Sequence, residues 1–177
     1  MHSVKKSPLG AVLVIVTCLI AGTPQVGHAA EPSGKDLTRH DLVFLPAHML
    51  AGMIREGKIT SSEVVEAYLE QIGKVNPRLN AIVTLDADGS RKRAREADKA
   101  LKRGELWGPL HGVPVTIKDN YATKGIKTTS GLPELSGYVP KHDATVVDLA
   151  KRAGAVILGK TNMPPLGMDT QTRGQLF

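Results

Sequence analysis

The stretch Pro109-Leu110-His111-Gly112-Val113-Pro114-Val115-Thr116-Ile117-Lys118-Asp119-Asn120 decides the fold. Val113, Val115 and Ile117 alternate with other residues, which is the period of a strand with one buried face. The strand delivers Lys118 at its carboxyl end, where α/β folds place their sites. Burial disfavours an ammonium ion, so a buried lysine has a lowered pKa and can act as a base near neutral pH. The sequence therefore predicts that Lys118 is a buried base.

Helical patterns precede this strand. A first helix carries its apolar positions at Leu45, Met49, Leu50, Met53 and Ile54, and the two methionines are expected to be core residues. Thr60 and Glu63 form a capping-box pattern that opens a second helix, which we expect to end near Asn76-Pro77. Residues 81–85 predict a short strand, and a third helix follows Asp86.

A long loop and a further helix–strand pair follow it. Residues 121–141 are rich in Gly, Thr, Ser and Pro, and a long loop inside a domain is usually functional. Asp143 is expected to cap the next helix, and Val156-Ile157-Leu158 to form a buried strand. Helices that alternate with strands predict an α/β fold.

Five ordered blocks resemble the amidase signature family. They are residues 59–63, 76–83, 108–120, 143–147 and 152–163, and the resemblance covers roughly residues 41–177. It implies the N-terminal part of the amidase signature fold, with a mixed sheet flanked by helices, and an incomplete domain.

The resemblance also implies a chemistry. Family members hydrolyse amides with a Ser-cisSer-Lys triad, and Lys118 matches the lysine. The two serines belong to a segment that follows the last block, and the sequence stops at Phe177 before it. We therefore expect a small-molecule amide substrate for a longer product, no cofactor, and no amidase activity from these 177 residues alone. The sequence leaves open whether the chain is naturally truncated or part of a longer gene product.

Two other functions stay open. One is a non-catalytic binding or regulatory remnant of the same scaffold. The other is a nucleotide-binding module, because Gly154–Thr161 satisfies the phosphate-loop pattern G-x-x-x-x-G-K-T. That motif needs a flexible loop, whereas Ala155-Val156-Ile157-Leu158 predicts a strand and Pro164-Pro165 leaves little room for the following helix. The same prolines stand where many relatives carry an acid, which leaves the substrate unassigned.

The chain begins with a predicted leader. Residues 1–30 combine Lys5 and Lys6 with an apolar run from Leu9 to Ile20, typical of a signal peptide cleaved near Ala29 or Ala30. An uncleaved anchor is the alternative. We expect a periplasmic or secreted protein with a flexible mature N-terminus over 31–40, an amidase domain over 41–177, and only transient membrane contact through the leader.

Charge and composition exclude several other classes. The net charge is +6, and the basic positions of the third helix, Arg91 to Arg103, lack the interleaved aromatics of a nucleic-acid surface, so we expect no nucleic-acid partner. The six histidines form no metal-binding set, and a single cysteine excludes an internal disulfide. His111 is expected to be a structural hydrogen-bonding residue and Ser130 a turn residue. Strand edges left open by truncation predict self-association.

Overall fold

The structure is a computed structural model that describes residues 37–172 and 176–177. The predicted leader, 1–30, and residues 31–36 lie outside the described residues. Arg39 and His40, at the end of the segment expected to be flexible, belong to helix α1 (Arg39–Leu42), which Thr38 and Asp41 open with a capping box. No helix of the described part is long and apolar enough to cross a membrane.

The remaining elements follow the predicted order. After α1 come α2 (Ala47–Arg55), α3 (Ser61–Leu79), β1 (Ile82–Leu85), α4 (Ala87–Lys102), β2 (Pro114–Lys118), the 3-10 turn η1 (Pro133–Leu135), α5 (Thr145–Arg152), β3 (Val156–Thr161) and the 3-10 turn η2 (Pro165–Gly167).

The three strands form one mixed sheet in the order β1-β3-β2. β3 lies in the centre, antiparallel to β1 and parallel to β2. In the parallel pair, Ile117 is in register with Lys160 and Lys118 with Thr161. The predicted α/β class with a mixed sheet flanked by helices is confirmed, and the carboxyl ends of β2 and β3 lie at the same edge of the sheet.

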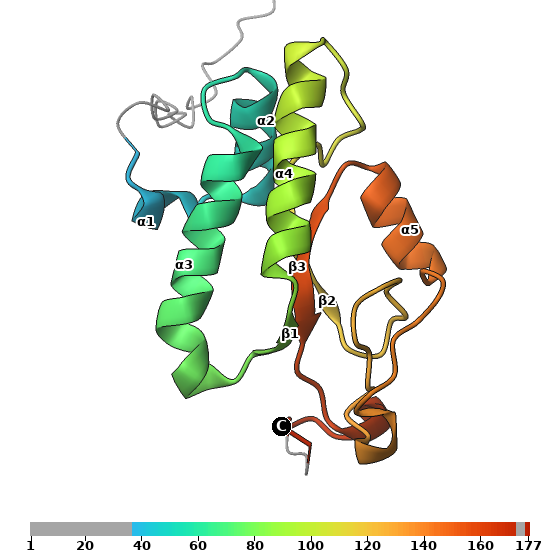
Figure 1. Ribbon diagram of the computed structural model, residues 1–177. Coiled ribbons are helices and arrows are strands. Elements are labelled where there is room, and N and C mark those ends of the chain that lie inside the picture. Colours follow the sequence, from blue (N-terminus) through green and yellow to red (C-terminus); the bar gives the residue numbers. More distant parts are fainter. Residues whose placement is uncertain (1–36, 173–175) are drawn as a thin grey trace, which may run out of the picture. The chain divides into compact units, whose positions relative to one another are not determined.

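Alternate residues of β3 serve the two faces of the sheet, as the period of a strand requires. Val156 and Leu158 pack on one face against α3 and α4. Ile157 packs on the other face with Ile126 and with Val147 of α5. Figure 1 shows α3 and α4 side by side along the sheet and α5 apart from them.

A separate apolar cluster joins α2 to the first turns of α3. It contains Leu50, Met53 and Ile54 of α2, and Val113 just before β2. Met53 is buried in this cluster, as the apolar spacing predicts. The capping box of Thr60 and Glu63 opens α3, which also confirms a prediction.

Two local predictions were wrong. α3 continues two residues past Asn76-Pro77 to Leu79 and ends on Asn80 in the left-handed conformation, whose N–H bonds to the carbonyl oxygen of Asn76 at 2.7 Å. Asp143 does not cap α5, whose N-cap position is Ala144 without a side-chain bond. The carboxylate instead accepts hydrogen bonds from the backbone N of Lys124 (2.7 Å) and from Lys151 Nζ (2.8 Å), so it fastens the long loop to α5.

Candidate active site

Lys118 ends β2 at the edge of the sheet where β3 also ends. Its side chain is exposed, so the prediction of a buried lysine was wrong for the described residues. β2 is an edge strand, so no second neighbouring strand of the described sheet lies beside it. Within residues 37–172 and 176–177, the amine makes no hydrogen bond and no ion pair. A side chain added at Gly167 would place its Cβ 3.5 Å from Lys118 Nζ, so the amine lies against turn η2.

The chain turns sharply after Lys118. The backbone N of Tyr121 donates to the carbonyl oxygen of Lys118 at 3.1 Å, which closes a turn. Asp119 inside this turn is completely buried. Its Oδ2 accepts hydrogen bonds from the backbone N of Thr129 (3.0 Å) and from the Thr129 hydroxyl. Asp119 therefore fastens the turn to a residue ten positions further along the loop.

The buried lysine of the site is Lys160 on β3, which is completely inaccessible to solvent. Its Nζ donates to the carbonyl oxygen of Tyr121 (2.6 Å) and to Oγ1 of Thr128 (2.7 Å). Burial lowers the pKa of Lys160 to about 8, and the charge of Asp119 opposes this shift. Sequence reasoning assigned the lowered pKa to Lys118 and considered Lys160 as part of the phosphate-loop match and of the last family block, near the substrate site. The feature of the sequence that could have indicated a buried Lys160 is its position in the same strand as the apolar run Val156-Ile157-Leu158.

The loop over residues 121–141 is ordered largely by its own contacts. It holds an isolated bridge between Thr123 and Ile126, and turn η1. Ser130 lies in a turn with φ +52°, its N–H bonded to the carbonyl oxygen of Asp119 and its own carbonyl to the N–H of Leu166. This confirms Ser130 as a turn residue. Gly131 follows with φ +70°, where a Cβ would lie 3.0 Å from the carbonyl oxygen of Met163, so loop and η2 segment approach closely.

His111 has the structural role that was predicted. It is buried, its Nδ1 accepts from the backbone N of Trp107 (3.1 Å), and its Nε2 lies 3.1 Å from the carbonyl oxygen of Ala97. A proton on Nε2 satisfies both bonds. Among the described residues, no group of three or more His, Cys, Asp or Glu side chains could hold a metal ion.

The phosphate-loop alternative is contradicted by the structure. Residues 156–161 form strand β3, with Lys160 buried at its end and proline residues after it. No flexible loop precedes a helix here, so the backbone N–H groups needed to cradle phosphate belong to the sheet.

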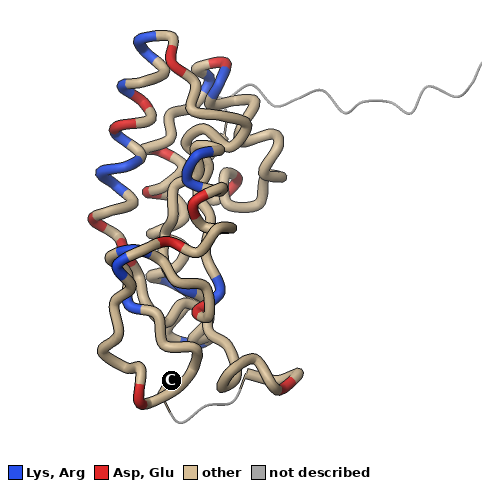
Figure 2. Tube along the Cα trace, turned by 90° about the vertical axis from the view of Figure 1, so that its right-hand side faces the viewer, with Lys and Arg blue, Asp and Glu red and all other residues tan. Residues whose placement is uncertain are grey.

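Some of the basic positions in and just after α4 are paired with acids. Arg91 makes a bidentate pair with Glu66, at 2.7 and 3.1 Å, and Arg103 pairs with Glu105. Arg93 lies 3.9 Å from the carboxylate of Glu96 and also stacks 3.7 Å from the ring centre of Trp107, and burial lowers its pKa. Figure 2 shows basic and acidic positions interspersed along the trace. These pairs support a solvated helix face.

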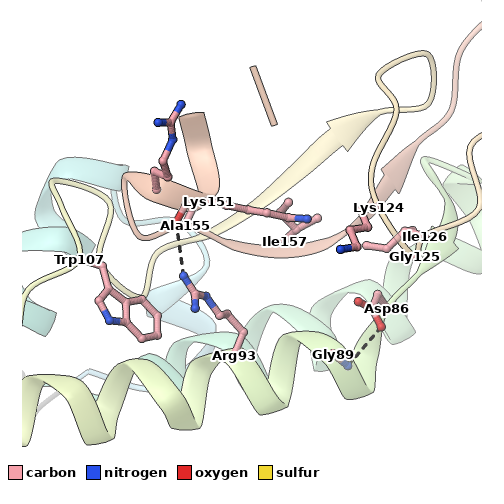
Figure 3. A pocket seen from close by; sticks show the side chains of 11 residues that line it. Asp86, Gly89, Arg93, Trp107, Lys124, Gly125, Ile126, Lys151, Ala155 and Ile157 are labelled. Atoms are coloured by element: carbon pink, nitrogen blue, oxygen red, sulfur yellow. Dashed lines mark hydrogen bonds between the residues drawn. The ribbon is translucent and has the colours of Figure 1, made fainter. Parts of the chain in front are cut away.

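A pocket of about 730 Å³ lies between α4, α5 and the loop (Figure 3), and Lys118 is not among the residues that line it. Its apolar lining includes Trp107, Ile126 and Ile157. The cationic side chains around it are Arg93, Lys124, Lys151 and Arg152. Sequence reasoning did not find this pocket, because its walls come from elements far apart in the chain.

Comparisons with known proteins agree with this fold. The Amidase family profile matches residues 63–177. A glutamyl-tRNA(Gln) amidotransferase subunit of Acidothermus cellulolyticus is 43% identical over 137 residues, which are 77% of this chain and 27% of that protein. The peptide amidase of Stenotrophomonas maltophilia is 36% identical, with a TM-score of 0.65 over 69% of this chain and 25% of the other. Fatty acid amide hydrolase is 27% identical, with a TM-score of 0.74 over 81% of this chain and 26% of the other.

The fold and the sequence thus define a part of an amidase-type α/β domain. The chain belongs to the Amidase family. It spans about a quarter of the length of the curated relatives that it matches.

Proposed function

We propose that this chain forms part of an amide hydrolase in which Lys118 is the proton acceptor. The main observation in support is the position of Lys118 at the carboxyl end of β2. Its amine has no partner among the described residues. The Amidase family match over residues 63–177 supports the reaction class.

In the proposed mechanism, Lys118 takes a proton from a bridging serine, which takes one from a nucleophilic serine. The nucleophile attacks the amide carbonyl, backbone N–H groups stabilise the oxyanion, and water releases the acyl group. Both serines come from polypeptide that follows the matched blocks in the family. The 177-residue chain alone is therefore expected to hydrolyse no amide. Turnover by the purified chain that disappears in Lys118→Ala would contradict this expectation.

A chimaera tests the role of Lys118 directly. Residues 41–177 would replace the corresponding quarter of the S. maltophilia peptide amidase, which is 36% identical to this chain. Lys118→Met is expected to lower kcat by about 10²–10⁴, the usual contribution of a general base. The exposed Lys102→Met, in α4 and outside the pocket, serves as a control that keeps the activity. Full activity of the Lys118→Met chimaera would refute the proposal.

The pocket between α4 and α5 favours one other candidate, a binding function without catalysis. Trp107 is the only tryptophan of the chain and lines this pocket, so its fluorescence reports occupancy. The cationic rim suggests an aromatic carboxylate such as benzoate as the first probe. Saturable quenching that is lost in Lys124→Met and Arg152→Met would support binding. Unchanged fluorescence up to millimolar probe would remove this candidate.

We further propose that the leader over residues 1–30 directs export to the periplasm or medium. The intact mass of the native product from the cell envelope tests this. A product that begins at residue 30 or 31 is expected, and a product that retains Met1 would contradict export by cleavage.

A further inference from the structure

Lys160 occupies a position that is costly for a lysine. Removing an ammonium from water carries a large desolvation penalty, and a methionine would fill a similar volume without that penalty. Lys160 is nevertheless completely buried, and both of its hydrogen bonds go to one loop, at Tyr121 and Thr128. The amine therefore ties the end of β3 to the segment that follows Lys118.

Thr128 and Thr129 extend this hydrogen-bonded connection along the loop. The Thr128 hydroxyl accepts from Lys160 and donates to the carbonyl oxygen of Ile126 at 3.0 Å. The next residue, Thr129, bonds to Asp119 through its backbone N and its hydroxyl, and its Oγ1 accepts from the N–H of Gly131 at 3.1 Å. Neighbouring threonines thus face the two buried ionisable residues of the site.

The chain of contacts returns to Lys118. Ser130 donates its N–H to the carbonyl oxygen of Asp119 and accepts from the N–H of Leu166 at 3.0 Å. Leu166 precedes Gly167, whose added Cβ would lie 3.5 Å from the amine of Lys118. The loop after β2 and the turn after β3 are therefore joined around the end of Lys118.

We infer that Lys160 is a positioning residue, which with Asp119 holds residues 119–131 and turn η2 in place around the amine of Lys118. The inference deepens the proposed function, since the positioned group is the proposed base. It needs no substrate to be tested, because the geometry exists in the chain itself.

The test compares two substitutions at Thr128 in the 177-residue chain. Thr128→Val removes the hydroxyl that Lys160 contacts, whereas Thr128→Ser keeps it. The amide N–H groups of Ser130 and Leu166 are expected to exchange with solvent about tenfold faster in Thr128→Val than in Thr128→Ser, the effect of losing one buried hydrogen bond. Amides of α3 and α4 should exchange equally in both, which separates loop loosening from general destabilisation.

The second readout is the NMR signal of Lys118 itself. With ¹³C-labelled lysine, the Cε resonance of Lys118 should move in Thr128→Val and in Lys160→Met but stay in place in Thr128→Ser and in the exposed variant Lys102→Met. Equal exchange in the two Thr128 variants, or a Lys118 resonance unchanged in Thr128→Val, would overturn the inference. The two proposals can fail separately. A chimaera whose activity is unchanged by Lys118→Met would refute the role of Lys118 as the base. The hydrogen-exchange and NMR data test whether Lys160 positions the loop.

Discussion

Lys160 and Asp119 are both completely buried, and Nζ of Lys160 lies 3.9 Å from Oδ1 of Asp119. This distance is an ion pair without a hydrogen bond. Within the described part of the chain, Oδ1 of Asp119 has no hydrogen-bond partner. Burial consequently outweighs the attraction, and the pKa of Lys160 falls to about 8. Stability should therefore respond both to pH and to substitution of either partner of this pair.

The first prediction concerns pH and stability. The pKa of Lys160 is about 8 in the folded chain against 10.5 for an ordinary lysine, and among the described residues Asp119 is the charged group beside it. Below about pH 8 both states hold the proton, so the burial cost is constant. Between about pH 8 and pH 10.5 only the unfolded chain keeps the proton on Lys160. The free energy of unfolding should therefore rise with pH over this range, by about 3 kcal/mol. Urea unfolding of wild type and Lys160→Met measures the rise, and an identical pH dependence in both would contradict it.

Removal of the other partner should be costly. Asp119→Ala leaves the Lys160 charge buried without a counter-ion and removes the acceptor of the Thr129 N–H, so the free energy of unfolding should fall by about 3–5 kcal/mol. The control is Asp88→Ala, because the Asp88 side chain is fully exposed and its ion pair with Arg91 is long, at 3.7 Å. Denaturant midpoints compare the two variants, and equal losses would show that burial of the pair does not matter.

Gly159 should tolerate no side chain. A Cβ at this position would overlap the carbonyl oxygen of Thr84 and lie 3.0 Å from Cα of Leu85, so Gly159→Ala must separate β1 from β3. We expect a loss of about 1–3 kcal/mol in the free energy of unfolding. Gly52→Ala in α2 is the matched control, since nothing lies within 4 Å of its added Cβ. Alanine should stabilise that helix by up to about 1 kcal/mol. A neutral Gly159→Ala would count against the observed strand contact.

We propose that the chain self-associates through β2, the edge strand that ends on Lys118. An unpaired edge offers its backbone groups to a second strand, and a charge placed on the edge opposes such pairing. Thr116 is an exposed residue of β2, so Thr116→Lys should lower the apparent mass in sedimentation, whereas the exposed Thr170→Lys should leave it unchanged. A monomeric wild-type chain that binds no hydrophobic dye would refute this proposal.

Local patterns predicted most elements of the fold correctly. The apolar spacing of α2 and α3, the strand at residues 82–85 and the strand before Lys118 all lie where expected. These features depend on neighbouring residues, because capping boxes and side-chain periods are local properties. The end of α3 was placed about two residues too early, and the cap of α5 was wrong because contacts with the long loop outweighed the local preference of Asp143. Asp143, for example, binds the backbone of Lys124 in the long loop and the side chain of Lys151 near the end of α5, and does not cap the first turn of that helix.

The candidate site was predicted only in part. The family resemblance and the position of Lys118 at a strand end were available from the sequence. The exchange of roles between an exposed Lys118 and a buried Lys160 was not, because burial depends on which strand lies at the edge of the sheet. The strand order β1-β3-β2 makes β3 central, although it is the last of the three strands in the sequence.

The family, the alternation of helices and strands, and the lysine that ends β2 could all be predicted from the residues alone. The folded chain was needed to show which lysine is desolvated, and that Asp119, Thr128, Thr129 and Leu166 meet around the site. The physical reason is that side-chain periods and caps act over one or two turns of chain, whereas desolvation and long-range hydrogen bonds depend on segments that only folding brings together.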